Sequence, residues 1–151
     1  MRIPSITLSI VVLPAPALAQ QWPSVPGFEE MKYPADNSMT AEKVELGKML
    51  YFDKRLSGDG TRSCYYCHVK EKGLTDGAPV AIGAYNAKLT RSAPTMWNVG
   101  YYDALYWDGR AASLEKQVLG AWSGGNMGAT GTGGKPSVDA VVGKLNQSDG
   151  Y

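Results

Sequence analysis

Two cysteines, Cys64 and Cys67, are separated by two residues and followed directly by His68. This is the spacing that covalent attachment of a c-type haem requires. Each thiol adds to one vinyl group of the porphyrin, and both sulfurs reach one haem edge from a single helical turn. The next imidazole then lies under the iron, so His68 becomes its proximal axial ligand. Because the chain has no other cysteine or histidine, the motif predicts one covalently bound haem c per chain.

Two other interpretations of this motif have less support. A structural zinc site needs four ligands, usually from two such clusters, and this chain has one cluster. A thioredoxin-like redox pair needs a βαβ setting around the first cysteine, and the flanking segments 59–62 and 69–72 do not have that pattern. A redox or structural disulfide stays the alternative to haem attachment.

Residues 1–19 resemble a secretion signal, with a positive charge at Arg2, an apolar run over 3–13 and a cleavage site before Gln20. The alternative is an uncleaved anchor, but this run is too short to cross a bilayer, which takes roughly twenty apolar residues. Export agrees with the haem motif, since bacteria attach haem c outside the inner membrane. We therefore expect a periplasmic mature protein without a stable membrane span.

The charge balance excludes one class of partner. The chain has 15 Lys and Arg and 14 Asp and Glu, and removal of Arg2 with the signal would make the two signs equal. A neutral chain without a basic run is not typical of nucleic-acid binding. Roughly 130 mature residues suit one small domain.

The remaining pattern predicts short helices joined by long ordered loops. Residues 20–39 are proline-rich and indicate an extended N-terminal segment. We expect helices from about residue 41 to Phe52, 93 to 98, 114 to 122, and 138 to 145. Thr40, Ser113 and Ser137 are the expected N-caps of the first, third and fourth. With no sustained strand pattern and no repeat, residues 40–151 are expected to form an all-α domain with long ordered loops around the haem.

Several segments resemble the bacterial dihaem cytochrome c peroxidase/MauG family. The most specific is Tyr106-Trp107-Asp108-Gly109-Arg110-Ala111, and the others are residues 45–53, 55–57, 73–77 and 91–95. The resemblance runs from about Ala41 to the end of the chain. Members have two cytochrome-c-like domains with one haem each, and this chain matches the N-terminal one. The resemblance thus implies that the haem domain is incomplete at its C-terminus and lacks the second haem domain.

The resemblance also implies a reaction and its partners. In this family the N-terminal haem reacts with hydrogen peroxide, and the other haem takes electrons from a periplasmic donor, such as a small cytochrome c or a cupredoxin. A tryptophan at the position of Trp107 lies between the haems as a candidate electron relay. A calcium ion sits near the domain junction, so calcium is expected here only with a second domain.

Three positions depart from the family pattern. Ala84 follows Ile82-Gly83, where regulated peroxidases have a histidine that caps the resting iron. Asn126 precedes Met127-Gly128 in place of the family's acid–base glutamate; its amide can hydrogen-bond peroxide but cannot shuttle a proton. Ser92 replaces the asparagine that supports calcium.

Other candidates carry two interpretations each. Trp107 is either a relay or an aromatic cover for the haem edge. Asp108 and Arg110 either position a haem propionate or form a solvated ion pair. Pro94 and Trp97 are candidate cofactor contacts.

Met127 decides between two functions. Its separation from His68 is similar to that of the methionine ligand in small monohaem cytochromes c, and thioether ligation would close the iron and raise its potential. Met96 is a second candidate, and packing is the default role for either. The leading expectation is a peroxidase-type oxidoreductase, slow or inactive as an isolated domain. The alternatives are a monohaem electron-transfer cytochrome with Met127 as sixth ligand and, with less support, a structural or regulatory haem subunit.

Overall fold

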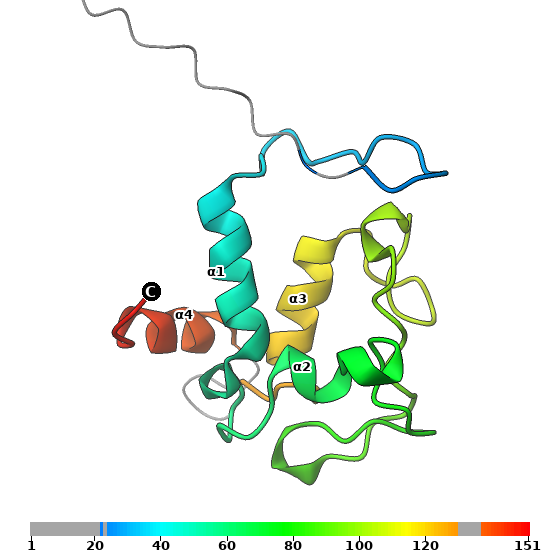
Figure 1. The fold of residues 1–151 in the computed structure, drawn as a ribbon. Coiled ribbons are helices and arrows are strands. Elements are labelled where there is room, and N and C mark those ends of the chain that lie inside the picture. Colours follow the sequence, from blue (N-terminus) through cyan, green and yellow to red (C-terminus); the bar gives the residue numbers. More distant parts are fainter. Residues whose placement is uncertain (1–21, 23, 130–136) are drawn as a thin grey trace, which may run out of the picture.

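The structure is a computed structural model that describes residues 22, 24–129 and 137–151. The expected signal segment, residues 1–19, lies outside the described residues. Figure 1 shows the described part as short helices joined by long loops: α1 (Ala41–Phe52), α2 (Cys64–Cys67), α3 (Leu114–Ser123) and α4 (Val138–Asn146). Between them lie the 3₁₀ turns η1 (Lys54–Leu56), η2 (Lys70–Lys72), η3 (Ala84–Asn86) and η4 (Val99–Tyr101).

Extended pairing in the described residues is confined to three isolated bridges, each of which closes a short loop: Val69–Thr75, Ile82–Lys88 and Leu105–Ala111. These bridges hold the long loops in defined conformations without forming a sheet. The expected all-α class is confirmed.

The three expected N-caps are confirmed. In each, the cap hydroxyl accepts a hydrogen bond from the backbone N–H three residues further on: Thr40 from Lys43, Ser113 from Lys116, and Ser137 from Ala140. Such a cap satisfies one of the unpaired donors of the first helical turn and typically stabilises a helix by about 1 kcal/mol. The first helix ends at Phe52, as the sequence predicts.

The expected helix over residues 93–98 is wrong. These residues form no helix, and the nearest regular turn is η4. The hydroxyl of Thr95 donates to the carbonyl of Gly73 at 2.8 Å and accepts from the N–H of Trp97 at 3.2 Å, so it ties the segment to a distant loop. Asn98 is left-handed, with a φ of 54°. A side chain that competes for backbone hydrogen bonds in this way disfavours helix.

A small apolar core joins the helices away from the haem motif. Its buried members are Leu56, Met127, Ala129 and Val141, and Leu50, Trp122 and Leu145 pack around them. The core thereby joins α1, η1, α3 and α4, and α4 contacts both α3 and η1. On α4, Val141 is fully buried and Val142 is 46% exposed.

The N-terminal segment packs along the helical part of the molecule. The rings of Phe28 and Tyr101 lie 4.6 Å apart between centroids, and the Asn37 side chain donates to Glu115 at 2.9 Å. Residues 24–39 contain turns but no helix. No helix in the described part of the chain is long and apolar enough to cross a membrane.

Candidate haem site

The haem motif forms one helical turn. Cys64 begins α2, Cys67 ends it, and the backbone N–H of His68 donates to the carbonyl of Cys64 at 3.1 Å. A turn of α-helix takes 3.6 residues, so the two cysteine side chains lie on the same side of the turn. Both thiols are unpaired and partly buried. Figure 1 shows α2 beside the lower end of α1, and the two helices are in contact.

The His68 ring is fixed from behind by the loop that follows it. Its Nδ1 lies 3.1 Å from the carbonyl oxygen of Leu74. Because a carbonyl can only accept, Nδ1 carries the proton and Nε2 keeps a free lone pair. The loop is closed by the bridge from the Val69 N–H to the Thr75 carbonyl at 3.0 Å. A backbone carbonyl on the second ring nitrogen is the support that metal-ligating histidines usually have.

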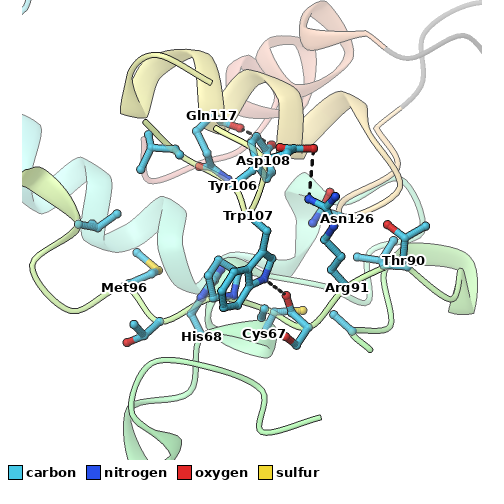
Figure 2. Close-up of a pocket in the computed structure, with 18 of the residues that line it drawn as sticks. Cys67, His68, Thr90, Arg91, Met96, Tyr106, Trp107, Asp108, Gln117 and Asn126 are labelled. Carbon is cyan, nitrogen blue, oxygen red and sulfur yellow. Dashed lines mark hydrogen bonds and ion pairs between the residues drawn. The ribbon is translucent and has the colours of Figure 1, made fainter. Parts of the chain in front are cut away.

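A cavity of about 500 Å³ lies against this turn, and Cys67 and His68 form part of its wall (Figure 2). This volume falls in the range of roughly 300–1,000 Å³ that cofactor pockets occupy. Much of the wall is apolar: Ala81, Leu89, Ala93, Pro94, Met96, Val99, Leu105 and Leu114. Polar side chains join it at Arg91, Asp108, Arg110, Gln117 and Asn126.

The thiols fit haem attachment better than redox exchange. Burial raises the pKa of the Cys64 thiol, and burial with the nearby Asp76 carboxylate raises the pKa of Cys67 to about 11. Reactive redox cysteines have lowered pKa values instead. Two protonated, unpaired thiols on one turn, a fixed imidazole and an apolar cavity are together the donor set that a c-type haem needs.

The Tyr106–Arg110 loop covers one side of the cavity. The bridge from Leu105 to Ala111 closes the loop. Trp107 lines the cavity and also a shallower surface hollow, and its indole N–H donates to the Ser92 carbonyl at 3.0 Å. The indole is 61% exposed. This border position is compatible with both interpretations of Trp107, the electron relay and the aromatic cover.

Asp108 joins two arginines at the cavity wall, Arg110 at 2.8 Å and Arg91 at 3.2 Å (Figure 2 draws the pair with Arg91). The hydrogen bond from Arg110 holds the Asp108 pKa below its usual range. The Arg110 guanidinium also stacks 3.5 Å from the centroid of the Tyr106 ring. Half-exposed pairs of this kind contribute little to stability. Two guanidinium groups on one carboxylate leave one net positive charge, which suits a carboxylate-bearing cofactor.

Three predicted site residues lie outside this cavity wall. Cys64 reaches the site through its place on α2, as the motif requires. Trp97 is 58% exposed and does not line the cavity. Met127 is 4% exposed and lies in the apolar core.

Met96 does line the cavity, but on the side of His68. The preceding residue, Thr95, is hydrogen-bonded to Gly73. Gly73 is next to Leu74, and the Leu74 carbonyl orients the His68 imidazole. Asn126 lines the cavity from the segment after α3. Ala84 is 1% exposed, and its N–H donates to the Asn126 carbonyl at 3.1 Å.

Three residues were not predicted from the sequence: Arg91 and Gln117, which line the cavity, and Arg62, which binds the loop at residues 82–86. Arg91 stands in a segment that carries the family resemblance, but no role was assigned to it. Gln117 follows Leu114 by one helical turn, and that spacing could have placed both on the cavity side of α3. Arg62 bonds a loop twenty or more residues away, and no local pattern indicates that contact.

The helical fold and this cavity define a cytochrome-c-like domain. Residues 41–151 match the family model described as di-haem cytochrome c peroxidase. The chain therefore belongs to the dihaem cytochrome c peroxidase/MauG family, and the family implies a c-type haem as cofactor.

Relatives agree with this assignment. The cytochrome-c peroxidase IdrP1 of Pseudomonas sp. strain SCT is 36% identical over 87% of this chain and 34% of its own length. The methylamine utilization protein MauG of Methylorubrum extorquens is 40% identical over 82% of this chain and 33% of its own length. The chain thus spans about a third of the length of these relatives.

A solved structure shares the fold. The crystal structure of a MauG-like protein associated with microbial copper homeostasis aligns with a TM-score of 0.72 and 34% identity, over 86% of this chain and 37% of that chain. The peroxidase lineage of the chain rests on these matches together with the family model.

Proposed function

We propose that this chain is the peroxide-reacting haem domain of a periplasmic peroxidase. Cys64 and Cys67 attach one haem c, and His68 is its proximal ligand. The substrate is hydrogen peroxide, and a small periplasmic cytochrome c or a cupredoxin supplies the electrons. One observation carries this proposal: the imidazole, fixed by the Leu74 carbonyl, lies in the wall of an apolar cavity of about 500 Å³.

When bound, the haem supplies the iron redox chemistry that cleaves the O–O bond. The hydrogen bond from His68 Nδ1 to the Leu74 carbonyl makes the imidazole a stronger electron donor. The apolar part of the wall, which includes Leu89, Val99 and Leu105, would pack against the porphyrin. The Asn126 amide orients peroxide by hydrogen bonding but transfers no proton, so turnover is slow. Trp107 is the proposed route for electrons, because it reaches from the cavity wall to the surface.

The position of the methionines favours an open sixth site. Met127 packs with Leu56, Ala129 and Val141 in the core, not in the cavity wall. Met96 lies beside the segment that supports His68, whereas a sixth ligand has to approach from the opposite face of the haem. The alternative, an electron carrier with Met127 as ligand, therefore has less support than the peroxidase.

The relatives are about three times as long as the matched part of this chain, so fast, sustained turnover is proposed to need a second haem domain, whereas this domain alone oxidises the donor slowly. Any calcium ion is proposed to lie near the junction between this domain and the second haem domain. Cleavage before Gln20 and export to the periplasm complete the proposal.

A single-turnover experiment tests the proposed function. The chain is produced with the bacterial machinery for haem c attachment, and the ferric protein is mixed with hydrogen peroxide and reduced cytochrome c or cupredoxin. We expect peroxide-dependent oxidation of the donor, above that of a Cys64→Ala/Cys67→Ala preparation processed in parallel. Donor oxidation equal to that of the haem-free preparation would contradict the proposal.

A further inference from the structure

Arg62, two residues before the haem motif, is a nearly buried arginine held by carbonyl groups. It is 9% exposed, and its Nε lies 3.1 Å from the Gly83 carbonyl oxygen and 3.3 Å from that of Ile82. Its Nη2 donates to Asn86 Oδ1 at 3.1 Å. In the described part of the chain, no carboxylate lies within ion-pair distance of this guanidinium. Buried arginines are usually paired with acids. Arg62 is unusual because it binds oxygen atoms of a loop instead.

The loop that Arg62 binds has a backbone that needs external support. Tyr85 and Asn86 both have positive φ, 54° and 57°. Such residues persist when the surrounding structure fixes them. Asp59 supplies one contact, because its carboxylate accepts from the Tyr85 N–H at 2.6 Å. Arg62 supplies two more, one to the Gly83 carbonyl ahead of the strained pair and one to the side chain of Asn86 within it.

The same loop is packed directly against the segment that carries Asn126. The Ala84 N–H donates to the Asn126 carbonyl at 3.1 Å. At Gly83 the two backbones approach so closely that an added Cβ would overlap the Gly125 carbonyl. Ala84 in turn packs against Gly128. The loop thus contacts the backbone of the segment whose Asn126 lines the cavity (Figure 2).

We infer that Arg62 is a positioning residue for the amide of Asn126. By fixing residues 82–86, Arg62 holds this amide at the distal face of the haem, which is the ligand-binding face opposite His68. This inference rests on the proposed function, because it takes Asn126 to face the incoming ligand. The guanidinium can engage the loop at several acceptors in one plane. A lysine keeps the charge but cannot reproduce that geometry.

A double-mutant cycle on the haem-loaded protein tests this link. Cyanide affinity of the ferric protein is measured in wild type, Arg62→Lys, Asn126→Ala and the double variant. Because Lys retains the positive charge, any change reports geometry rather than net charge. We expect Arg62→Lys to weaken cyanide binding roughly threefold to tenfold, as for residues coupled in one hydrogen-bond network. In the Asn126→Ala background the same substitution should change affinity by less than about twofold.

The contrary outcomes are separable. An equal effect of Arg62→Lys in both backgrounds, or no effect in either, overturns the positioning role alone. If Asn126→Ala leaves cyanide affinity unchanged, Asn126 does not face the ligand, and the distal assignment in the proposed function fails together with this inference.

Two further variants serve as a matched control and as a replacement for Arg62→Lys. Arg55→Lys is the matched control, because the exposed Arg55 side chain pairs with Asp53 outside the cavity wall, and the cyanide affinity of this variant should equal that of wild type. If Arg62→Lys fails to fold, Asn86→Gly decides instead, since it removes one acceptor of Arg62 and glycine tolerates the positive φ. We expect a smaller loss of affinity that disappears in the Asn126→Ala background; a loss that persists there contradicts the role.

Discussion

The two faces of the cavity are built in different ways. On the proximal side, the motif, the imidazole and the carbonyl that orients it all lie between Cys64 and Thr75. On the distal side, Asn126 is held by Ala84, and the Ala84 loop is held by Arg62 and Asp59. These contacts join segments that are far apart in the sequence.

The difference separates the residues that resemble the family from those that depart from its expected pattern. The proximal side carries the motif residues that resemble the family. The distal side carries two of the departures, Ala84 and Asn126, and they are in direct backbone contact. We therefore expect haem attachment to depend on one local turn, and the rate of the proposed reaction to depend on the packing of two distant loops.

The largest expected effect is on the proximal side. Replacing both Cys64 and Cys67 by Ala removes the two thioether bonds, so the exported protein should contain no covalent haem. Intact mass and extraction into acidified acetone measure this directly. Tyr66→Phe, between the two cysteines, keeps the ring beside Arg62 and should retain full attachment. Covalent haem in the double variant would refute the assignment.

The next largest effect is on the distal side. Asn126→Glu introduces a carboxylate that can move a proton, and general acid–base catalysis typically contributes about 10²–10⁴-fold. The rate of reaction with peroxide, measured by stopped flow, should rise toward that range and become pH-dependent. Asn126→Gln is the matched control because it has the same length without an acid, and it should give no comparable increase. Equal rates for the two variants would show that residue 126 does not meet the substrate.

The third prediction compares the stability effects of a glycine-to-alanine substitution in two places, the loop at residues 82–86 and helix α1. Gly83→Ala pushes a methyl group into the Gly125 carbonyl and should lower the free energy of unfolding by about 1–3 kcal/mol. Gly47→Ala, inside α1 with open space around it, should raise this free energy by about 0.5–1 kcal/mol. Urea unfolding measures both. A neutral Gly83→Ala would mean that the two loops are not in close contact.

The smallest expected effect concerns the support behind the motif. The Tyr51 hydroxyl donates to the His68 carbonyl at 2.6 Å, and Tyr51→Phe should cost about 0.5–1.5 kcal/mol at neutral pH. Burial, with Cys64 and Tyr65 nearby, raises the pKa of Tyr51 to about 12. Since the folded pKa exceeds the ordinary value of 10.0, this stabilisation is complete below pH 10 and is lost as pH rises through 12. The difference between wild type and Tyr51→Phe should therefore shrink over that interval; a constant difference would contradict it.

The sequence was sufficient for the parts of the molecule whose signals are local. The capped helices and the haem motif follow from side chains within a few residues of the backbone that they affect. The segment over residues 93–98 was predicted as a helix because Pro94 is a good helix start, but Thr95 bonds to Gly73 instead. No pattern within the segment reports such a partner.

The site divides along the same line. The motif predicts Cys64, Cys67 and His68, and the family resemblance predicts Asn126; the structure places Cys67, His68 and Asn126 in the cavity wall. Met127 was the ambiguous case, because an apolar sulfur suits both a core and an iron. Its position beside Val141, which α4 brings to the core, is a consequence of long-range packing. Arg62 gave no signal, since its acceptors in the distant loop are two backbone carbonyls and the side chain of Asn86.

The central claim is that His68 holds the iron and that the opposite face is open. The most direct test is the optical and electron paramagnetic resonance spectrum of the ferric, haem-loaded protein. We expect a largely high-spin iron, five-coordinate or water-bound, that binds cyanide or azide rapidly, with a resting spectrum unchanged by Met127→Ala. A low-spin spectrum with a thioether-to-iron charge-transfer band that disappears in Met127→Ala would contradict the claim and identify an electron carrier.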